Sequence, residues 1–404
     1  MQDANPSQEG PMPGALDGVR ILDFTRYQQG PFATVLLSDL GADVIKVEEP
    51  THGDLGRSLG LQPDGWCSYF QALNRNKRSL TVDTRTEAGR EIVYRLIPET
   101  DVVTDNFRPG TMKRFGLDHE SLAAINPRII TASASGFGPK GPFAHEPSFD
   151  SIGQAMGGHM VAQGGGPDAE PAVVIGGMAD QVGAMIFALG ICAAIAAREL
   201  HGVGQHVDTS LLGSQLALQG LGLTGFLRQG EQRSGGTRWN PLFTYYPCAD
   251  GLYLSLGLLD PKWWPAFCEA LERDDLMVDE RFAQPAGRIG NREALIEELN
   301  LTFARKPRDE WLTLLKAANL PCGPVNDYAA VAKEPQVIAN EYITTLQDAN
   351  LGEVGVVGSP IDMSVTVSGP RSTAPDLGQH TEEILLEFGY TWDDIERFKE
   401  SSVI

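Results

Sequence analysis

The chain has 404 residues, of which 42% are apolar, so it can bury a large core in more than one domain. Its 53 Asp and Glu residues outnumber its 32 Lys and Arg residues, and the net charge of -21 argues against binding to nucleic acid or to an anionic membrane. The 5 cysteines lie far apart, and their spacing indicates neither a disulfide framework nor a zinc site. A reducing cytoplasm is therefore the expected location.

Two segments bear on targeting. Residues 1–14 are polar and rich in Pro and Gly, without the basic start and apolar stretch of a secretory signal, so we expect a loose arm. The most apolar window, residues 182–197, is rich in Gly and Ala and is short for the ~30 Å hydrocarbon layer of a membrane. We expect this window to form a buried core helix.

Strand-like and helix-like segments alternate along the first half of the chain. The predicted strands cover residues 18–24, 43–47, 101–104, 128–133 and 206–211. The predicted helices cover residues 31–41 and 87–96, a short segment near Ser121, and segments that begin at Asp150 and after Asp180. This alternation predicts an α/β fold with a mainly parallel, Rossmann-like sheet.

The pattern changes after Arg228, where the chain becomes polar and Gly-rich before a hairpin-like pair of strands at residues 243–248 and 252–257. Further strand-like runs and two helices are expected near the C-terminal end. The predicted organisation is a large α/β domain in residues 1–227, a smaller α+β domain in residues 228–335, and a part in residues 336–404 that completes the large domain.

Two short motifs resemble known signatures without the structural context that those signatures need. Residues 220–225 match the GxGxxG dinucleotide fingerprint, but they lie within a helical stretch. Residues 56–60 match the GxSxG nucleophile elbow, but they lie in a loop rich in Pro and Gly. Since no His pairs at ligand spacing with a carboxylate or a second His, no metal site is expected.

Asp180 lies between two glycines, Gly176 and Gly177, and a long apolar stretch. An aspartate in this position can be a helix N-cap that satisfies backbone N–H groups. Alternatively, the glycines let a substrate approach the carboxylate, and the N–H groups at the helix start help to bind developing negative charge. The spacing alone leaves both interpretations open.

Cations gather in the first third of this acidic chain. They are Arg75, Lys77, Arg78, Arg85, Arg108, Lys113 and Arg114. A solvated helix face explains many such runs, but these residues lie in expected loops and helix starts, where phosphate groups are often held. We therefore predict that this region binds phosphate.

Long segments with many distinctive positions run from about Leu16 to the end of the chain. They include LDGVRILDFTRYQQGPFATVLLSDLGADVIKVEEPTHGD, NRNKRSLTVD, DNFRPGTMKRFGL, SGFGPKGP, GGMAD, HGVGQHVDTSL, LPCGPVND and LGQHTEEIL. In these segments the chain resembles the class III CoA-transferases. This CaiB/BaiF-like group contains formyl-CoA transferase and carnitine CoA-transferase, together with α-methylacyl-CoA racemases.

Carried over by position, the resemblance implies that Asp180 is a covalent nucleophile and that Gln28 lies near the thioester. The implied CoA contacts are Gln28, Gln29, Val82, Asp83, Arg85, Asn106, Phe107, Arg108, Arg114, Ser135, Gly136, Phe137 and Gly138. Two positions depart from the formyl-CoA enzyme, which has a lysine at Ser135 and an arginine at Glu49. The formyl-CoA enzyme also has a glycine loop that covers its active site. In this chain only Gly235 and Gly236 remain of that loop, and the resemblance implies that they lie at the substrate.

The implied reaction moves CoA from an acyl-CoA thioester to a free carboxylic acid through mixed anhydrides and an aspartyl-CoA thioester. No metal, redox group or tightly bound cofactor is implied, because coenzyme A is itself the transferred group. A carboxylate suits this role because it is ionised near neutral pH, with an ordinary pKa of ~3.9.

The identity of the donor and acceptor acids stays open. Five aromatic residues line an acyl site or belong to a core, namely Phe226, Trp239, Phe243, Tyr245 and Tyr246.

The resemblance also implies a partner, since the family forms two chains threaded through one another as an interlocked homodimer. The polar stretches at residues 229–240 and 332–341 are compatible with linkers for such an arrangement. A heteromer with a paralogous chain is an alternative. A racemase of the same family is another, but it needs a His where this chain has Phe149, before Asp150, so transfer is favoured.

Overall fold

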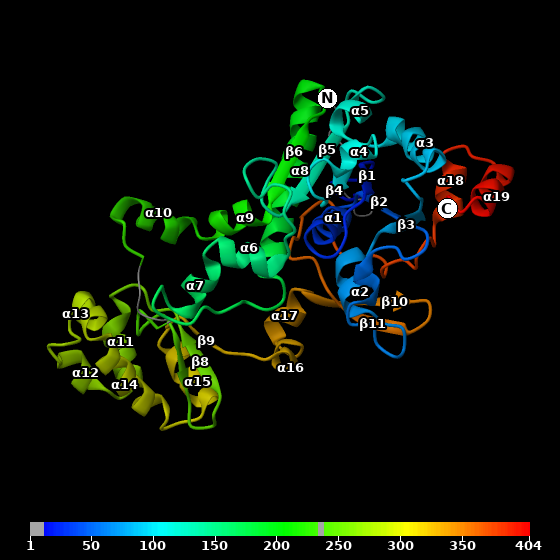
Figure 1. Cartoon of the computed structure of the whole chain (residues 1–404). Coiled ribbons are helices and arrows are strands. Elements are labelled where there is room, and N and C mark those ends of the chain that lie inside the picture. The colour runs from blue at the N-terminus through cyan, green and yellow to red at the C-terminus, as the bar shows by residue number, and fades with distance from the viewer. Residues whose placement is uncertain (1–11, 233–237) are drawn as a thin grey trace, which may run out of the picture. The chain divides into compact units, whose positions relative to one another are not determined.

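The computed structural model describes residues 12–232 and 238–404. These residues form two compact units (Figure 1). The first unit comprises residues up to 159, residues 173–229 and residues 338–404. The second comprises residues 160–172 and 230–337.

A six-stranded parallel sheet organises the first unit, with strand order β3-β2-β1-β4-β5-β6. The strands are β1 (Arg20–Asp23), β2 (Asp43–Glu48), β3 (Arg78–Thr81), β4 (Val102–Asp105), β5 (Ile130–Ser135) and β6 (His206–Ser210). The predicted parallel α/β fold is confirmed, although the sequence did not reveal β3. The strand order reverses between β1 and β4, where the loops after these strands diverge and leave room for a ligand.

Helices cover both faces of this sheet. On one face, α1 (Gln29–Asp39) and α8 (Met178–His201) form a core in which Phe187 and Ile191 pack with Ile21. On the other face, the core around Leu22 includes residues of α3 (Glu87–Leu96), α18 (Thr381–Glu387) and α19 (Trp392–Glu400). Segments from both ends of the chain therefore share one core.

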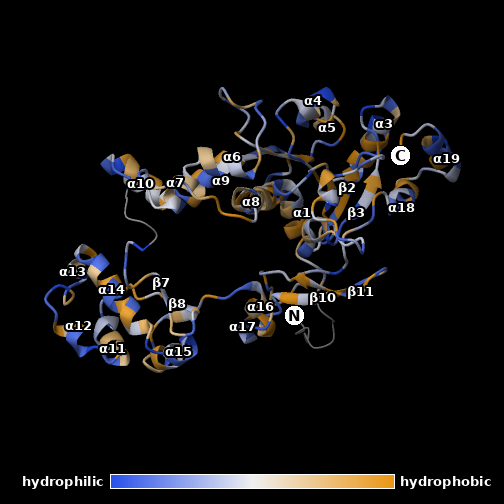
Figure 2. Ribbon diagram, turned by 60° about the horizontal axis from the view of Figure 1, so that its bottom comes forward, coloured by the Kyte–Doolittle hydropathy of each residue, from blue (hydrophilic) through white to orange (hydrophobic). Residues whose placement is uncertain are grey.

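Helix α8 contains the apolar window that the sequence predicted to be a core helix. By length and composition this helix could cross a membrane, and 44% of its most apolar window is buried. Its buried residues, among them Ala184, Phe187 and Ala194, face the sheet. Figure 2 shows hydrophobic colour along α8 and mainly hydrophilic colour on α19. The packing agrees with the predicted core role.

Shorter elements complete the first unit. They are η1 (Leu55–Ser58), α2 (Ser68–Asn74), η2 (Ile97–Glu99), α4 (Thr111–Arg114), α5 (His119–Ala123), α6 (Asp150–Met156), α9 (Leu211–Leu218), α10 (Gly220–Gln229), and the antiparallel pair β10 (Ile343–Asp348) and β11 (Gly352–Val357). The GxGxxG match lies inside α10, and the GxSxG match overlaps η1, so neither has the context of its motif.

The second unit is built on an antiparallel sheet of β7 (Tyr245–Pro247), β8 (Tyr253–Leu256) and β9 (Cys322–Pro324). Its helices are α11 (Trp263–Ala270), α12 (Asp274–Val278), α13 (Pro285–Gly290), α14 (Arg292–Phe303) and α15 (Arg308–Ala317). Helix α7 (His159–Gly164) begins at the junction of the units, and α16 (Tyr328–Val331) and α17 (Pro335–Ala339) lead out of the second. Tyr246 is fully buried beside Phe303, so it belongs to the core.

Candidate active site

A pocket of about 270 Å³ opens at the carboxyl ends of β1 and β4, where the strand order reverses. The loops after these two strands and the first turn of α8 contribute to its lining. The pocket brings together the following residues that the resemblance implied: Gln28, Gln29, Asn106, Phe107, Arg108, Gly136 and Asp180. This is the place at which an open parallel sheet usually binds its ligand.

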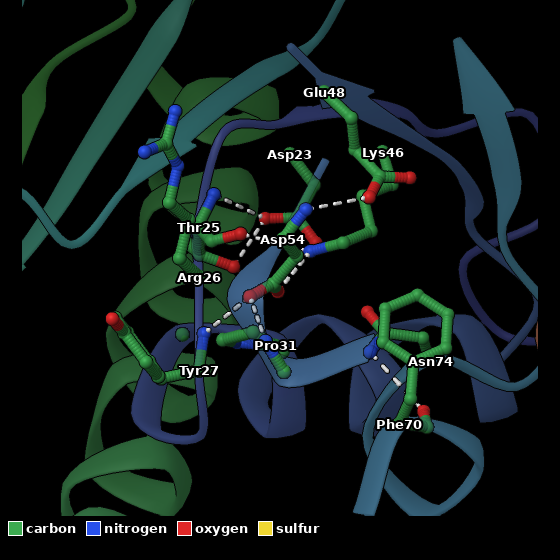
Figure 3. Close-up of polar contacts among 12 residues, drawn as sticks. Asp23, Thr25, Arg26, Tyr27, Pro31, Lys46, Glu48, Asp54, Phe70 and Asn74 are labelled. Carbon is green, nitrogen blue, oxygen red and sulfur yellow. Dashed lines mark hydrogen bonds and ion pairs between the residues drawn. The ribbon is translucent and has the colours of Figure 1, made fainter. Parts of the chain in front are cut away.

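The loop after β1 has no regular secondary structure, and side chains hold its backbone. Thr25 donates its N–H to Asp23 Oδ1 at 3.0 Å, and its carbonyl accepts from Lys46 Nζ at 2.9 Å. Arg26 exchanges two hydrogen bonds with the Asn106 amide, at 2.8 and 2.7 Å. Figure 3 shows the buried partners Asp23 and Lys46 beside Thr25. The amide that was implied to contact CoA is therefore occupied in joining the loops after β1 and β4.

Tyr27 completes this loop in a left-handed backbone conformation, with φ of 62°. This conformation is uncommon for a residue with a side chain, so it needs support from its surroundings. Asp54 Oδ1 accepts the Tyr27 N–H at 3.1 Å, and Asp54 Oδ2 pairs with Lys46 Nζ at 2.9 Å. These contacts restrain the backbone just before Gln28, whose side chain lines the pocket.

Two buried ion pairs lie beneath the loop. Lys46 pairs with Asp54 and Lys77 pairs with Asp23, each at 2.9 Å, and these side chains are at most 1% exposed. Burial raises the pKa of Asp23, but the charges of Lys77 and Lys46 outweigh it and lower that pKa to about 2. Burial lowers the pKa of Lys77 to about 8, against the opposing charge of Asp23.

These pairs correct part of the predicted phosphate-binding region. Lys77 is fully enclosed, Arg75 is paired with Asp39, and Arg78 is paired with Asp43. Each cation is neutralised inside the first unit, so the prediction that these three cations hold phosphate is wrong. Loop position in the sequence does not distinguish a cation that turns inward from one that faces a ligand.

Asp180 lies in the first turn of α8, a helix that directly follows two glycines with left-handed backbone. The left-handed φ of 79° at Gly177 favours glycine, and a Cβ there would lie 2.1 Å from Gln28 Nε2, so that the Gln28 side chain would have to move. Gln28 Nε2 donates to the Gly176 carbonyl at 3.0 Å. Gln29 also packs closely against α8, since a Cβ on Gly183 would lie 2.6 Å from its Nε2. The start of α1 is thus fitted against the start of α8.

Asp150, not Asp180, satisfies the first N–H groups of α8. Its Oδ1 accepts from Ala179 N at 2.6 Å and from Asp180 N at 3.2 Å, while its Oδ2 accepts from Gln154 Nε2 at 2.7 Å. The N-cap residue itself is Gly177. The N-cap interpretation of Asp180 is therefore wrong, and these two N–H groups are not free to bind a substrate oxygen.

The Asp180 carboxylate accepts no hydrogen bond from the residues that the structure describes. Burial and then the negative charge of Asp150 raise its pKa from 3.8 to about 7. This corrects the expectation of an ordinary carboxylate, because about half of the groups are protonated near pH 7. The sequence could not show this effect, since Asp150 approaches only through the packing of α6 against α8.

Seven implied CoA contacts do not line this pocket: Ser135, Phe137 and Gly138 at the end of β5, and four residues that precede β5. Val82 is buried in the core, so its side chain does not face a ligand. Asp83 is paired with Arg85 at 2.7 Å, and Arg85 also reaches Glu49 at 3.4 Å. Arg114 is exposed on α4, where it donates to a hydroxyl of its own helix. CoA binding at these four positions stays a prediction. The charge of Arg85 is already partly neutralised by Asp83 and Glu49.

The remaining implied residues follow β5. Ser135 Oγ accepts the Gly138 N–H at 3.0 Å and closes a turn that includes Gly136 and Phe137. Gly235 and Gly236 lie outside the described residues. Within residues 12–232 and 238–404, no group of three or more His, Cys, Asp or Glu side chains is arranged to hold a metal ion.

We predict that Asp180→Asn stabilises the fold, and more so at high pH. The native carboxyl binds its proton more tightly than the unfolded one, so its contribution is present below pH 3.8 and is lost as pH rises through about 7. Asn cannot ionise. The gain in Tm over wild type should be larger at pH 8 than at pH 5, measured by calorimetry, with Asp17→Asn as an exposed control. A gain that is independent of pH would contradict the burial argument.

Comparison with known proteins adds an independent line of observation. The chain is 38% identical over 389 residues to the succinyl-CoA:mesaconate CoA-transferase of Haloarcula hispanica, a match that covers 93% of this chain and 97% of that protein. It is 35% identical over 407 residues to the succinyl-CoA–D-citramalate CoA-transferase of Chloroflexus aurantiacus, covering 98% and 100%.

The fold and the family agree with these relatives. The crystal structure of a CAIB/BAIF family protein from Brucella suis has a TM-score of 0.83 and 34% identity, and the match covers 93% of this chain and all of that one. Residues 16–381 match the family described as CoA-transferase family III. The resemblance seen in the sequence is confirmed: the chain is an enzyme of the CoA-transferase class and belongs to CoA-transferase family III.

Proposed function

We propose that this enzyme moves CoA from an acyl-CoA thioester to a free carboxylic acid, with Asp180 as the covalent nucleophile. The observation that carries the proposal is a half-buried carboxylate without a hydrogen-bond partner among the described residues, in a pocket at the carboxyl ends of β1 and β4. A partly desolvated carboxylate with a raised pKa is a stronger nucleophile than one in water.

The proposed reaction exchanges one leaving group at a time. The Asp180 carboxylate attacks the thioester carbonyl, the C–S bond breaks, and a mixed anhydride and CoA thiolate form. The thiolate then attacks the aspartyl carbonyl, which releases the donor acid and leaves an aspartyl-CoA thioester. The acceptor carboxylate repeats these steps in reverse order. Each step is an acyl transfer without net gain or loss of protons, since carboxylate and thiolate carry the charge.

Gln28 and the glycines before α8 keep the approach to Asp180 open. Gly177 offers no side chain between the carboxylate and an incoming thioester, and the Gln28 amide is held in place by the Gly176 carbonyl. We propose that this amide orients the thioester, and that Arg108 and Arg114 contact CoA phosphates. Both arginines are exposed and lie on the segment after β4.

We propose a dicarboxylic acid as a substrate. Mesaconate and citramalate, the acids in the names of the two relatives described above, are both dicarboxylic acids, and each relative uses succinyl-CoA. The pocket includes two arginines, Arg26 and Arg108, which suit a ligand with more than one negative charge. A racemase is less well supported, because the wall beside Asp180 carries the Phe149 ring, which cannot transfer a proton.

We further propose that the protein is a homodimer of interlocked chains that acts in the cytoplasm. Helix α8 carries an apolar stripe on the side away from its own core, formed by Met185, Leu189, Ala193, Ala196 and Leu200. Leu189 is 66% exposed and Leu200 is 79% exposed. An exposed apolar stripe of this length favours burial against a second chain. A paralogous chain is the alternative partner.

Asp180→Ala should abolish transfer while CoA binding persists, because the variant loses the attacking group and keeps the pocket. Incubation of wild-type protein with succinyl-CoA alone should leave a CoA adduct on the peptide that contains Asp180, detected by mass spectrometry. Asp17→Ala, at an exposed acidic position, is the matched control. Substantial transfer by the Asp180→Ala variant would exclude the mechanism.

The rate of wild-type transfer should rise with pH through about 7, as Asp180 loses its proton. Asp150→Asn removes the neighbouring charge and keeps an oxygen for the N–H groups of α8. Its profile of kcat/KM should therefore rise at a lower pH than that of wild type. Asp17→Asn should leave the profile in place. An unchanged midpoint in Asp150→Asn would show that the charge of Asp150 does not act on the nucleophile.

The dimer should persist on dilution to nanomolar concentration, because interlocked chains separate only on unfolding. Light scattering and native mass spectrometry should detect no folded monomer, and urea should abolish activity and assembly together. A well-folded monomer at low concentration would contradict the interlocked arrangement. Assembly only with a paralogous chain would support the heteromer.

A further inference from the structure

We infer that Arg26 binds the second carboxylate of a dicarboxylic acyl group and thereby selects the substrate. This inference rests on the proposed function, which assigns the first carboxyl carbon of that group to Asp180. Arg26 was not among the residues implied by the resemblance. It follows β1, two residues before Gln28, and lines the same pocket of about 270 Å³ as Asp180.

Hydrogen bonds restrain both the N–H and the carbonyl of Arg26, so the position of its Cα atom is well defined. Its N–H donates to Asn106 Oδ1 and its carbonyl accepts from Asn106 Nδ2. The neighbouring Thr25 carbonyl is held by Lys46, and the Tyr27 N–H by Asp54. A side chain that starts from such a constrained loop loses less freedom when it binds a ligand.

The guanidinium lies over the Phe107 ring, 5.2 Å from its centroid. Stacking on an aromatic face orients the guanidinium plane and leaves the N–H groups at its edge available for a carboxylate. Figure 3 shows the Arg26 side chain pointing away from the buried carboxylates Asp23 and Asp54. The guanidinium is planar, and its edge N–H groups can donate two parallel hydrogen bonds to the two oxygens of a carboxylate.

Among the described residues, the two arginines of the pocket, Arg26 and Arg108, have no acidic partner, in contrast to other arginines of the first unit. Arg57, Arg75 and Arg78 are each paired with a carboxylate at 2.5–2.7 Å. No described carboxylate lies within ion-pair distance of Arg26, although the chain carries a net charge of -21. An unpaired arginine at a pocket of so acidic a chain therefore marks a place for an anionic ligand.

The charges around the pocket explain why a dicarboxylic ligand needs this cation. Glu146 lines the pocket, and Asp150 lies directly behind Asp180. A free carboxylate on the acyl group would be repelled by both. The second arginine of the pocket, Arg108, also lines a separate cavity of about 440 Å³ and is assigned to CoA in our proposal. Arg26 lines the pocket that contains Asp180 and does not line that second cavity.

The test compares succinyl-CoA with butyryl-CoA, which has the same number of acyl carbons but lacks the distal carboxylate. Binding is measured by calorimetry in the Asp180→Asn variant, so that no transfer occurs. This variant should bind succinyl-CoA more tightly than butyryl-CoA by roughly tenfold or more, the value of a charge-assisted hydrogen bond. Adding Arg26→Gln should abolish that preference and leave the affinity for free CoA unchanged, while Arg26→Lys should restore part of it.

The matched control is Arg108→Gln, which should weaken free CoA and both thioesters alike. If Arg26→Gln also weakens all three ligands equally, Arg26 contacts CoA and the inference is wrong. If the preference for succinyl-CoA survives in Arg26→Gln, another group recognises the carboxylate and the inference is again wrong. Failure of the proposed function is seen separately, as the absence of a CoA adduct on wild-type Asp180 after incubation with succinyl-CoA.

Discussion

The ion pairs sealed beneath the loop after β1 are the constraint on which the site depends. Lys46 and Lys77 lie there beside Asp54 and Asp23 without contact with solvent. Burying an isolated charge is very unfavourable, and removing one partner would leave the other uncompensated. The same side chains bind the backbone of Thr25 and its neighbours. These contacts restrain the loop, which favours a pocket geometry that is set before a substrate binds.

Two aspartates of the first unit show how partners decide the behaviour of a carboxyl group. Asp23 and Asp180 are both removed from water, and burial raises the pKa of each. For Asp23 the neighbouring lysines outweigh burial, and its pKa falls to about 2. For Asp180 the neighbour is Asp150, and its pKa rises to about 7. The first group supports the fold, whereas the second is held in a less stable ionised state, and strongly shifted carboxyl groups of this kind are common at functional sites.

Much of the fold could be predicted because its signals are local. The strands at residues 43–48 and 102–105 and the helix at residues 87–96 are marked by continuous apolar runs or by helical periodicity. The strand at residues 78–81 was missed, because it is short and begins with an arginine whose charge is neutralised by Asp43 from β2. A local pattern cannot anticipate a partner that is distant in the chain.

The sequence by itself determined the family and the parallel α/β class, and it suggested Asp180 as a candidate, because each rests on residues that are adjacent in the chain. Only the tertiary structure decided which polar groups meet. It assigned the capping of α8 to Asp150, turned Lys77 inward, and left Arg26 without an acidic partner among the described residues. The physical reason is that charge and burial act through space. The sign of a pKa shift and the availability of a cation depend on neighbours that folding alone brings together.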